Sequence, residues 1–213
     1  MNTSSKTTKL VILGLLTAIL LVMAYTPLGY LNIGPLAISF NMIPVAIAAI
    51  TLGPVGGAVV GAVFGLTSFL QCIGVGGTSG MGVILFEISP VLAFVQRFVP
   101  RVLDGFLLGY IYSGTKKLFN PYAACFVTGF FSAFLNTAFF MTALVALFGN
   151  TDYVRELMDG RNVIVFICAF VGVNAVCEML SSTVISGAVG TALIKAKLIP
   201  TADLKKASPQ ETA

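Results

Sequence analysis

Long apolar segments with few charged residues are the feature that most constrains how this chain can fold. Only 9% of its 213 residues are charged, whereas ordinary soluble domains carry about 25%. Apolar runs approaching 20 residues are long enough to cross a bilayer as helices. The sequence therefore predicts an all-α integral membrane protein with six transmembrane helices, at about Leu10–Ala24, Phe40–Leu52, Val55–Leu70, Pro90–Tyr112, Tyr122–Phe148 and Val163–Ile194.

Lysines mark the connections that would fall on one side of this membrane domain. They precede the first segment, separate the fourth from the fifth and follow the sixth, as Lys6, Lys9, Lys116, Lys117, Lys195, Lys197, Lys205 and Lys206. Because positive loops face the cytoplasm, both termini are expected there. The chain then divides into a cytoplasmic N-terminal segment (1–8), a six-helix membrane domain (9–197) and a polar cytoplasmic tail (198–213). Cleavage of the N-terminal run as a signal peptide is the less favoured alternative.

Several classes of protein are excluded by residues or motifs that the sequence lacks. It has no histidine, which excludes zinc-protease motifs and Ser-His-Asp catalysis. Its four cysteines show no CxxC spacing, so they are expected to pack in apolar surroundings rather than to bind metal. No basic run is interleaved with aromatic residues, as nucleic-acid binding would require. We expect no enzyme activity, no metal and no cofactor in this chain.

Three charged residues interrupt the fourth apolar segment, in FVQRFVPRVLDGF (94–106). Arg97, Arg101 and Asp104 are four and three residues apart, so they share one helix face. A charge at the centre of a membrane helix costs about 2.5–3.5 kcal/mol on insertion scales and usually marks a ligand, a partner or a pathway. Two structural alternatives stand beside this: Asp104 could neutralise Arg101 locally, and the shallower Arg97 could snorkel outward.

Polar residues on three segments are expected at one depth. Measured from the outer end of its segment, Arg101 lies about 11 residues in, or roughly 16 Å, and Asn136 and Asn174 lie about 12 residues in, or about 18 Å. This agreement indicates a cavity that opens to the outside and holds a polar ligand. An arginine there favours a carboxylate or phosphate, which it can bind through two parallel hydrogen bonds. The candidate substrate-binding residues are Arg101, Asn136, Asn174, Glu178, Asn41 and Gln71.

Small residues recur at four-residue spacing in two segments. Gly57, Gly61 and Gly65 belong to the third segment, where internal helix packing is the favoured interpretation. Gly14 and Ala18 belong to the first segment. There, packing within the protein and docking of a partner helix are nearly equally favoured, because a first helix at the rim of a bundle has fewer neighbours.

Longer motifs resemble a known family. TLGPVGGAVVGAVFGLTSF (51–69), FVPRVLDGFLLG (98–109) and NAVCE (174–178) are similar to substrate-binding S components of energy-coupling factor (ECF) vitamin transporters, over roughly residues 8–196. FGLTSF (64–69), followed by a glycine-rich loop and then by Pro-Arg (100–101), resembles their pantothenate-type branch.

The resemblance implies a subunit that binds a vitamin with high affinity from outside. It implies docking through Gly14 and Ala18 onto a separate transmembrane scaffold subunit, driven by two ATPase subunits that hydrolyse the ATP. Family members usually show Ala-xxx-Ala at this place, where this chain has Gly14 and Ala18. The chain lacks the N-terminal histidine of the family's cobalt and nickel binders and the tryptophan of its thiamin binders. With Arg101 present, pantothenate is favoured, and folate or riboflavin is less so.

A stand-alone secondary transporter or channel for a small organic anion is the alternative of a different class. In such a protein Glu178 would relay protons. Many secondary transporters contain an inverted repeat, and the sequence shows no strong internal repeat. A membrane enzyme ranks third.

Overall fold

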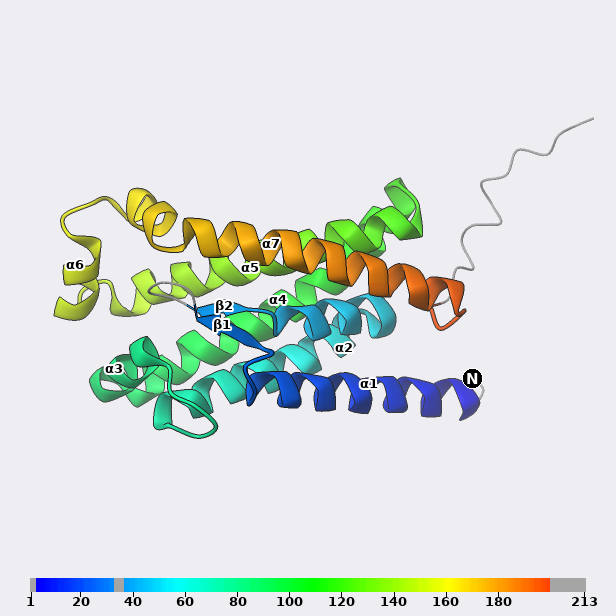
Figure 1. Cartoon of the computed structure of the whole chain (residues 1–213), viewed down its shortest axis with the longest axis horizontal. Helices are drawn as coiled ribbons and strands as arrows, with labels where there is room; N and C mark the ends of the chain where they lie inside the picture. Colours follow the sequence, from blue (N-terminus) through cyan, green and yellow to red (C-terminus); the bar gives the residue numbers. More distant parts are fainter. Residues whose placement is uncertain (1–2, 33–36, 200–213) are drawn as a thin grey trace, which may run out of the picture.

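The computed structural model describes residues 3–32 and 37–199, and these are mainly helical (Figure 1). A short antiparallel hairpin, β1 (Tyr30–Asn32) and β2 (Ala37–Ser39), follows the first helix. In chain order the helices are α1 (Thr3–Ala24), α2 (Met42–Leu70), the short 3-10 turn η1 (Gln71–Ile73), α3 (Gly80–Ile88), α4 (Pro90–Leu118), α5 (Pro121–Phe148), α6 (Asp152–Met158) and α7 (Val163–Lys195). Residues 200–213, most of the expected polar tail, lie outside the described residues.

Local capping residues fix where the later helices begin. The Asn120 Oδ1 accepts a hydrogen bond from the backbone N–H of Ala123 at 2.7 Å, which satisfies one of the free donors at the start of α5. Pro90 and Pro121 occupy the first turns of α4 and α5, where proline has no helical hydrogen bond to lose. The side chains that cap helices in this way are Ser79, Ser89, Asn120, Thr151 and Asn162.

The chain reverses direction inside α2, at Gly53. This residue has φ 78° and ψ −166°, a backbone conformation that is essentially restricted to glycine. A Cβ placed on Gly57 would lie 3.0 Å from that of Ala49, although eight residues of a straight helix span about 12 Å. The two parts of α2, 42–52 and 54–70, therefore run back along one another (Figure 1). The second and third predicted apolar segments, Phe40–Leu52 and Val55–Leu70, are therefore joined by a tight reversal of the chain.

Glycines of the second part of α2 allow α4 to approach very closely. A Cβ on Gly57 would meet the carbonyl oxygen of Gly105, and a Cβ on Gly61 would meet that of Arg101. Gly65 contacts the same helix one turn further along. The internal packing expected from the glycine spacing is confirmed, and it fixes the backbone of α4 at Arg101 against its neighbour.

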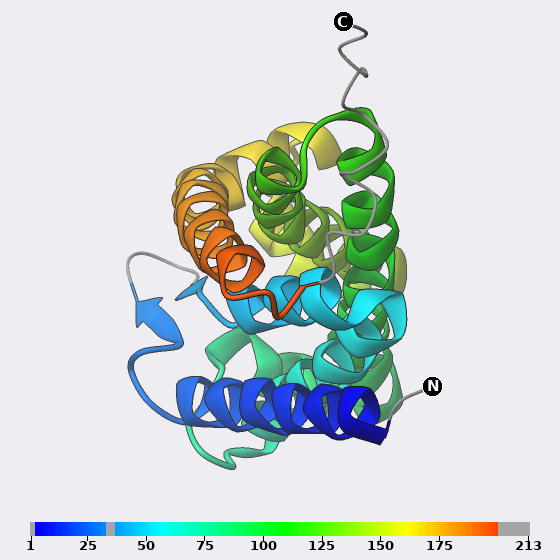
Figure 2. The ribbon, with the colours of Figure 1, turned by 90° about the vertical axis from the view of Figure 1, so that its right-hand side faces the viewer.

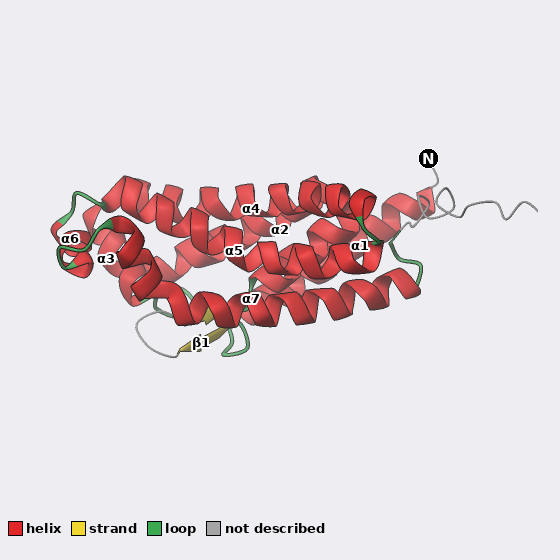
Figure 3. Ribbon diagram, turned by 90° about the horizontal axis from the view of Figure 1, so that it is seen from above, coloured by secondary structure: helices red, strands yellow, loops and turns green. Residues whose placement is uncertain are grey.

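The long helices lie side by side along one axis (Figures 1 and 3). Seen along this axis, α2 lies between α1 and the group formed by α4, α5 and α7 (Figure 2). The start of α1, the connection from α4 to α5 and the end of α7 gather at one end of the bundle, and α3 and α6 lie at the other (Figure 1). Lysines of all three predicted groups, represented by Lys6, Lys116 and Lys195, therefore belong to the same end.

Four of the described helices are long and apolar enough to cross a membrane: Lys6–Ala24, Met42–Ile73, Pro121–Phe148 and Asn174–Lys195. The 29-residue α4 has a similar length but carries the charges of the fourth segment. Large apolar side chains such as Leu15, Leu103 and Phe134 are exposed on the outer surface of the bundle. Such a surface suits lipid, because soluble monomers rarely expose large contiguous apolar patches.

Candidate functional site

A cavity of about 780 Å³ lies among α2, α4, α5 and α7. The hairpin and the glycine-rich loop between η1 and α3 complete its wall, so the cavity lies toward the end of the bundle that α3 covers. The lining is partly aromatic and partly polar. The lining residues include Tyr30, Ser39, Phe64, Ser68, Gln71, Ser79, Arg97, Arg101, Asn136, Phe140, Asn174 and Glu178.

Five of the six predicted substrate-binding residues meet in this wall. Arg101 comes from α4, Asn136 from α5, Asn174 and Glu178 from α7, and Gln71 from η1. The first three were predicted to lie at one depth, and the structure brings them to one cavity. Their contact with a ligand remains a prediction.

Asn41, the sixth, lies behind the wall rather than in it. It is fully buried at the start of α2, and its Nδ2 donates to the carbonyl oxygen of Gly29 at 3.3 Å. Gln71 has a comparable bond, since its Nε2 donates to the carbonyl oxygen of Ala24 at 2.9 Å. Both amides thereby hold the segment that connects α1 to the hairpin.

Arg101 is buried in the cavity wall without an ionic partner. Its guanidinium carbon lies 4.7 Å from the ring centre of Phe140 and 5.2 Å from that of Phe64. The Nε and Nη1 atoms are buried and have no hydrogen-bond partner. Asp104, one turn away, is fully buried, and neither of its carboxyl oxygens has a partner. In the described part of the chain the two residues form no ion pair, so direct neutralisation of Arg101 by Asp104 is not observed.

Arg97 also points into the cavity, and the outward snorkelling considered for it is wrong. The side chain is only 7% exposed, because α2 and the loop before α3 cover it. Its Nη1 donates to Ser68 Oγ at 3.5 Å and its Nη2 donates to Ser79 Oγ at 3.2 Å. Its guanidinium carbon is 5.1 Å from the ring centre of Phe140.

The two guanidinium groups create a positively charged wall. Both contact the Phe140 ring, so their carbons are at most about 10 Å apart. Two unit charges at that distance repel by about 2 kcal/mol at an effective dielectric constant of ~20. Among the described lining residues Glu178 is the acid, and its Oε1 already accepts a hydrogen bond from the backbone N–H of Ser39 at 2.6 Å.

The glycine-rich loop and the aromatic residues of the wall were not among the predicted site residues. Gly76 has φ 76°, and a Cβ there would collide with the Tyr25 ring, so glycine lets the loop close against the end of α1. Burial raises the pKa of Tyr30. Its hydroxyl is protonated at neutral pH, as that of any ordinary tyrosine is, and can donate a hydrogen bond. Clustered glycines were the available sequence signal for the loop, whereas nothing in the pattern singled out Phe64 or Phe140 among 17 phenylalanines.

This arrangement suits a small organic anion with an apolar body. Unpaired guanidinium donors bind carboxylates, the amides bind hydroxyl or amide groups, and the rings cover apolar carbon. The described residues contain no group of His, Cys, Asp and Glu that could hold a metal ion. A bundle with a lipid-facing surface around such a cavity defines a multi-pass membrane protein that binds a small solute.

Comparison with known proteins identifies the family. Residues 8–196 match the model of the ECF transporter, substrate-specific component, and the chain belongs to this family. The pantothenic acid transporter PanT of Lactococcus lactis subsp. cremoris is 26% identical over 204 residues, which cover 91% of this chain and 97% of the relative. The pantothenate transporter PanT of Leuconostoc mesenteroides subsp. mesenteroides is 29% identical over 205 residues, which cover 90% of this chain and 94% of the relative. The chain is thus a multi-pass transport component of the cell membrane, as its resemblance to the family had implied.

Proposed function

We propose that this protein is the pantothenate-binding membrane subunit of an ECF-type importer. The observation that carries the proposal is Arg101, a guanidinium in the cavity wall that is 5% exposed and has two buried nitrogens without partners. A buried donor without a partner is destabilising, and a ligand carboxylate removes that penalty. Both curated relatives are named for pantothenate.

The chemistry of pantothenate matches the cavity group by group. Its carboxylate pairs with Arg101, and its amide and hydroxyl groups bond with Asn136 and Asn174. Phe64 and Phe140 provide apolar contact for its dimethyl carbon. Folate also has carboxylates but carries a large aromatic ring system, and riboflavin has no carboxylate for Arg101.

The proposed membrane topology has six crossings with both termini in the cytoplasm. The reversal at Gly53 makes the two parts of α2 run in opposite directions, as two crossings require, and α4 and the other three long helices supply the remainder. The end of the bundle that carries Lys6, Lys116 and Lys195 would face the cytoplasm. The cavity lies toward the opposite end, so the ligand would enter from outside.

Partner subunits would supply the energy for uptake. In this proposal α1 docks onto a transmembrane scaffold subunit through Gly14 and Ala18, and two separate ATPase subunits hydrolyse ATP. Both residues are exposed, no atom lies within 4 Å of a Cβ placed on Gly14, and α1 is the least buried of the four candidate spans. The chain itself would bind its substrate without chemical change and without a cofactor.

Identification of the bound molecule tests the proposal. The protein would be purified from cells in mild detergent, and the small molecule released on denaturation would be identified by mass spectrometry. Titration of the emptied protein with pantothenate should then give saturable binding. Release of a different vitamin, or no binding of pantothenate, would overturn the substrate assignment. Uptake without ATPase subunits would favour the stand-alone transporter, whose proton relay would be Glu178.

A further inference from the structure

Arg97 presents a second guanidinium to the same cavity, one helical turn from Arg101. Its two hydrogen bonds, at 3.5 and 3.2 Å, go to the neutral hydroxyls of Ser68 and Ser79, and its Nε is buried without a partner. Hydrogen bonds from a guanidinium to a carboxylate are usually shorter, near 2.7–2.9 Å, and about twice as strong. The hydroxyls therefore hold Arg97 in place without neutralising it.

Both guanidinium groups lie against the same aromatic ring of the cavity wall, that of Phe140. Their carbons lie 5.1 and 4.7 Å from the centre of Phe140. The two carbons are therefore at most about 10 Å apart, and like charges at that separation repel each other unless an anion lies between or beside them. Among the described lining residues Glu178 is the acidic one, and its Oε1 accepts a hydrogen bond from the backbone N–H of Ser39. Asp104 does not line the cavity. Among the described residues no acidic side chain lies within ion-pair distance of either guanidinium, so both positive charges are available to a ligand anion.

We propose that Arg97 and Arg101 together bind a single carboxylate of the ligand, and that Arg97 is a specificity-determining residue that rejects neutral analogues. This inference rests on the proposed function and adds to it the residue that distinguishes a charged ligand from a neutral one. A carboxylate has two oxygens and about four lone-pair positions, so it can accept from two guanidinium groups at once. A neutral amide of the same shape offers fewer acceptors and leaves both positive charges unpaired.

A purely structural role for Arg97 is the competing interpretation. Its hydrogen bond to Ser68 joins α4 to α2, and its hydrogen bond to Ser79 joins α4 to the residue that precedes α3. If that were its only role, removal of the guanidinium would loosen the cavity wall. Binding of charged and neutral ligands would then weaken to the same extent, and the empty protein would lose stability.

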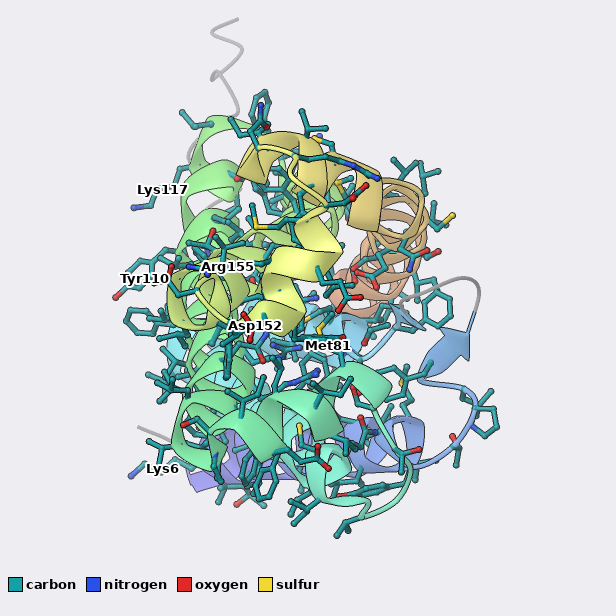
Figure 4. All side chains as sticks on the ribbon, turned by 90° about the vertical axis from the view of Figure 1, so that its left-hand side faces the viewer. Lys6, Met81, Tyr110, Lys117, Asp152 and Arg155 are labelled. Carbon is teal, nitrogen blue, oxygen red and sulfur yellow. The ribbon has the colours of Figure 1, made fainter. Side chains whose placement is uncertain are left out.

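The test compares the affinity of the purified protein for pantothenate and for its neutral primary amide. We expect the wild-type protein to prefer the acid. Arg97→Gln and Arg101→Gln should each lower the ratio of the affinity for pantothenate to the affinity for the amide by about tenfold or more. This is the usual effect of losing a hydrogen bond to a charged group. The affinity for the amide should change much less. Arg155→Gln removes an equivalent charge from the exposed surface of α6 and should leave the ratio unchanged (Figure 4).

Thermal unfolding of the empty protein gives a second, ligand-independent measurement. Arg97→Gln should leave the midpoint unchanged or raise it, because one of two neighbouring like charges is removed. A fall in the midpoint as large as that of a Ser68→Ala, Ser79→Ala double variant, with equal losses for acid and amide, would overturn the inference in favour of the structural role.

The outcomes for the wild-type protein separate this inference from the proposed function. Equal affinity for pantothenate and its amide would overturn the two-arginine carboxylate site while leaving pantothenate as the substrate. Failure to bind either compound would overturn the proposed function, and the inference that rests on it would fall too. A lowered ratio in Arg101→Gln with an unchanged ratio in Arg97→Gln would assign the carboxylate to Arg101 alone.

Discussion

The backbone N–H of Ser39 donates a hydrogen bond to Oε1 of Glu178 at 2.6 Å, and so joins residues that are 139 positions apart in the chain. Ser39 ends β2 and Glu178 lies in the middle of α7, and both line the cavity. Hydrogen bonds from a backbone N–H to a carboxylate are among the stronger ones in proteins. One carboxylate therefore attaches the edge of the hairpin to the wall that holds the proposed ligand.

Loss of this bond should make bound pantothenate dissociate faster. Glu178→Gln removes the charge but keeps an acceptor oxygen, whereas Glu178→Ala removes both. We expect the alanine variant to release ligand about tenfold faster than the glutamine variant, in line with one hydrogen bond to a backbone donor. Dissociation of radiolabelled pantothenate from the purified protein measures the rates. Glu87→Ala, at an exposed position of α3, is the control. Equal rates for the two Glu178 variants would show that the bond does not retain the ligand.

Replacing Arg101 should weaken ligand binding strongly. Hydrogen bonds to charged groups contribute about 1.5–3 kcal/mol, so Arg101→Ala should lower the affinity by roughly ten- to a hundredfold or more. Arg101→Lys should restore only part of this, because an ammonium cannot form the two-pronged contact. Isothermal titration with pantothenate gives the affinities.

The Asp104 variant separates a ligand role for Arg101 from a structural one. Because the structure has no Arg101–Asp104 ion pair, the Arg101→Ala, Asp104→Ala double variant should fold and still fail to bind. Recovery of both stability and binding in the double variant would mean that Arg101 serves mainly to neutralise Asp104.

An alanine at Gly61 should destabilise the protein and disturb the site together. Its Cβ would meet the Arg101 carbonyl oxygen, so α4 must shift away from α2. We expect the free energy of unfolding to fall by about 1–3 kcal/mol, as is usual for overpacking. Pantothenate affinity should fall as well, since the backbone of Arg101 moves. Gly114→Ala changes the same residue type in α4 where nothing lies within 4 Å, and it should be neutral or slightly stabilising. A Gly61→Ala variant as stable as Gly114→Ala would contradict the close packing.

Bulky residues on α1 should separate binding from uptake. Gly14→Leu and Ala18→Leu lie on the exposed helix, so the purified subunit should bind pantothenate normally. Uptake by proteoliposomes that contain the complete importer should be abolished, because the helix can no longer approach a scaffold helix closely. Ala146→Leu, an exposed position of α5, is the matched control and should transport normally. Equal loss of binding and uptake would show that the two residues pack the fold.

Labelling of single cysteines should report the orientation in the membrane. With the four native cysteines replaced, a cysteine at Lys117 should react only from the cytoplasmic side and one at Asp152 only from outside. Both positions are exposed, and they lie toward opposite ends of the bundle, at the end of α4 and at the start of α6 (Figure 1). The reverse pattern would overturn the proposed entry of ligand from outside.

Much of the helical framework was predictable because its signals are local. Apolar runs set the positions of the long helices, and the caps and first-turn prolines set the starts of α4, α5 and α7 to within one residue of expectation. The Gly-Pro pair at 53–54 is a local sequence signal for the turn at Gly53. The exception is α1, which begins at Thr3 rather than near Leu10 because no residue between them breaks a helix.

The sequence alone also identified the polar residues that enter the bundle and, from the helix rise, predicted that Arg101, Asn136 and Asn174 lie at one depth. Only the tertiary structure decided which way each side chain turns. It placed Asn41 behind the wall, turned Arg97 inward onto Ser68, Ser79 and Phe140, and left Asp104 apart from Arg101. The physical reason is that periodicity fixes the relative positions of residues on one helix. The rotation of that helix, and the residues it meets, depend on packing between segments as distant in sequence as Ser39 and Glu178.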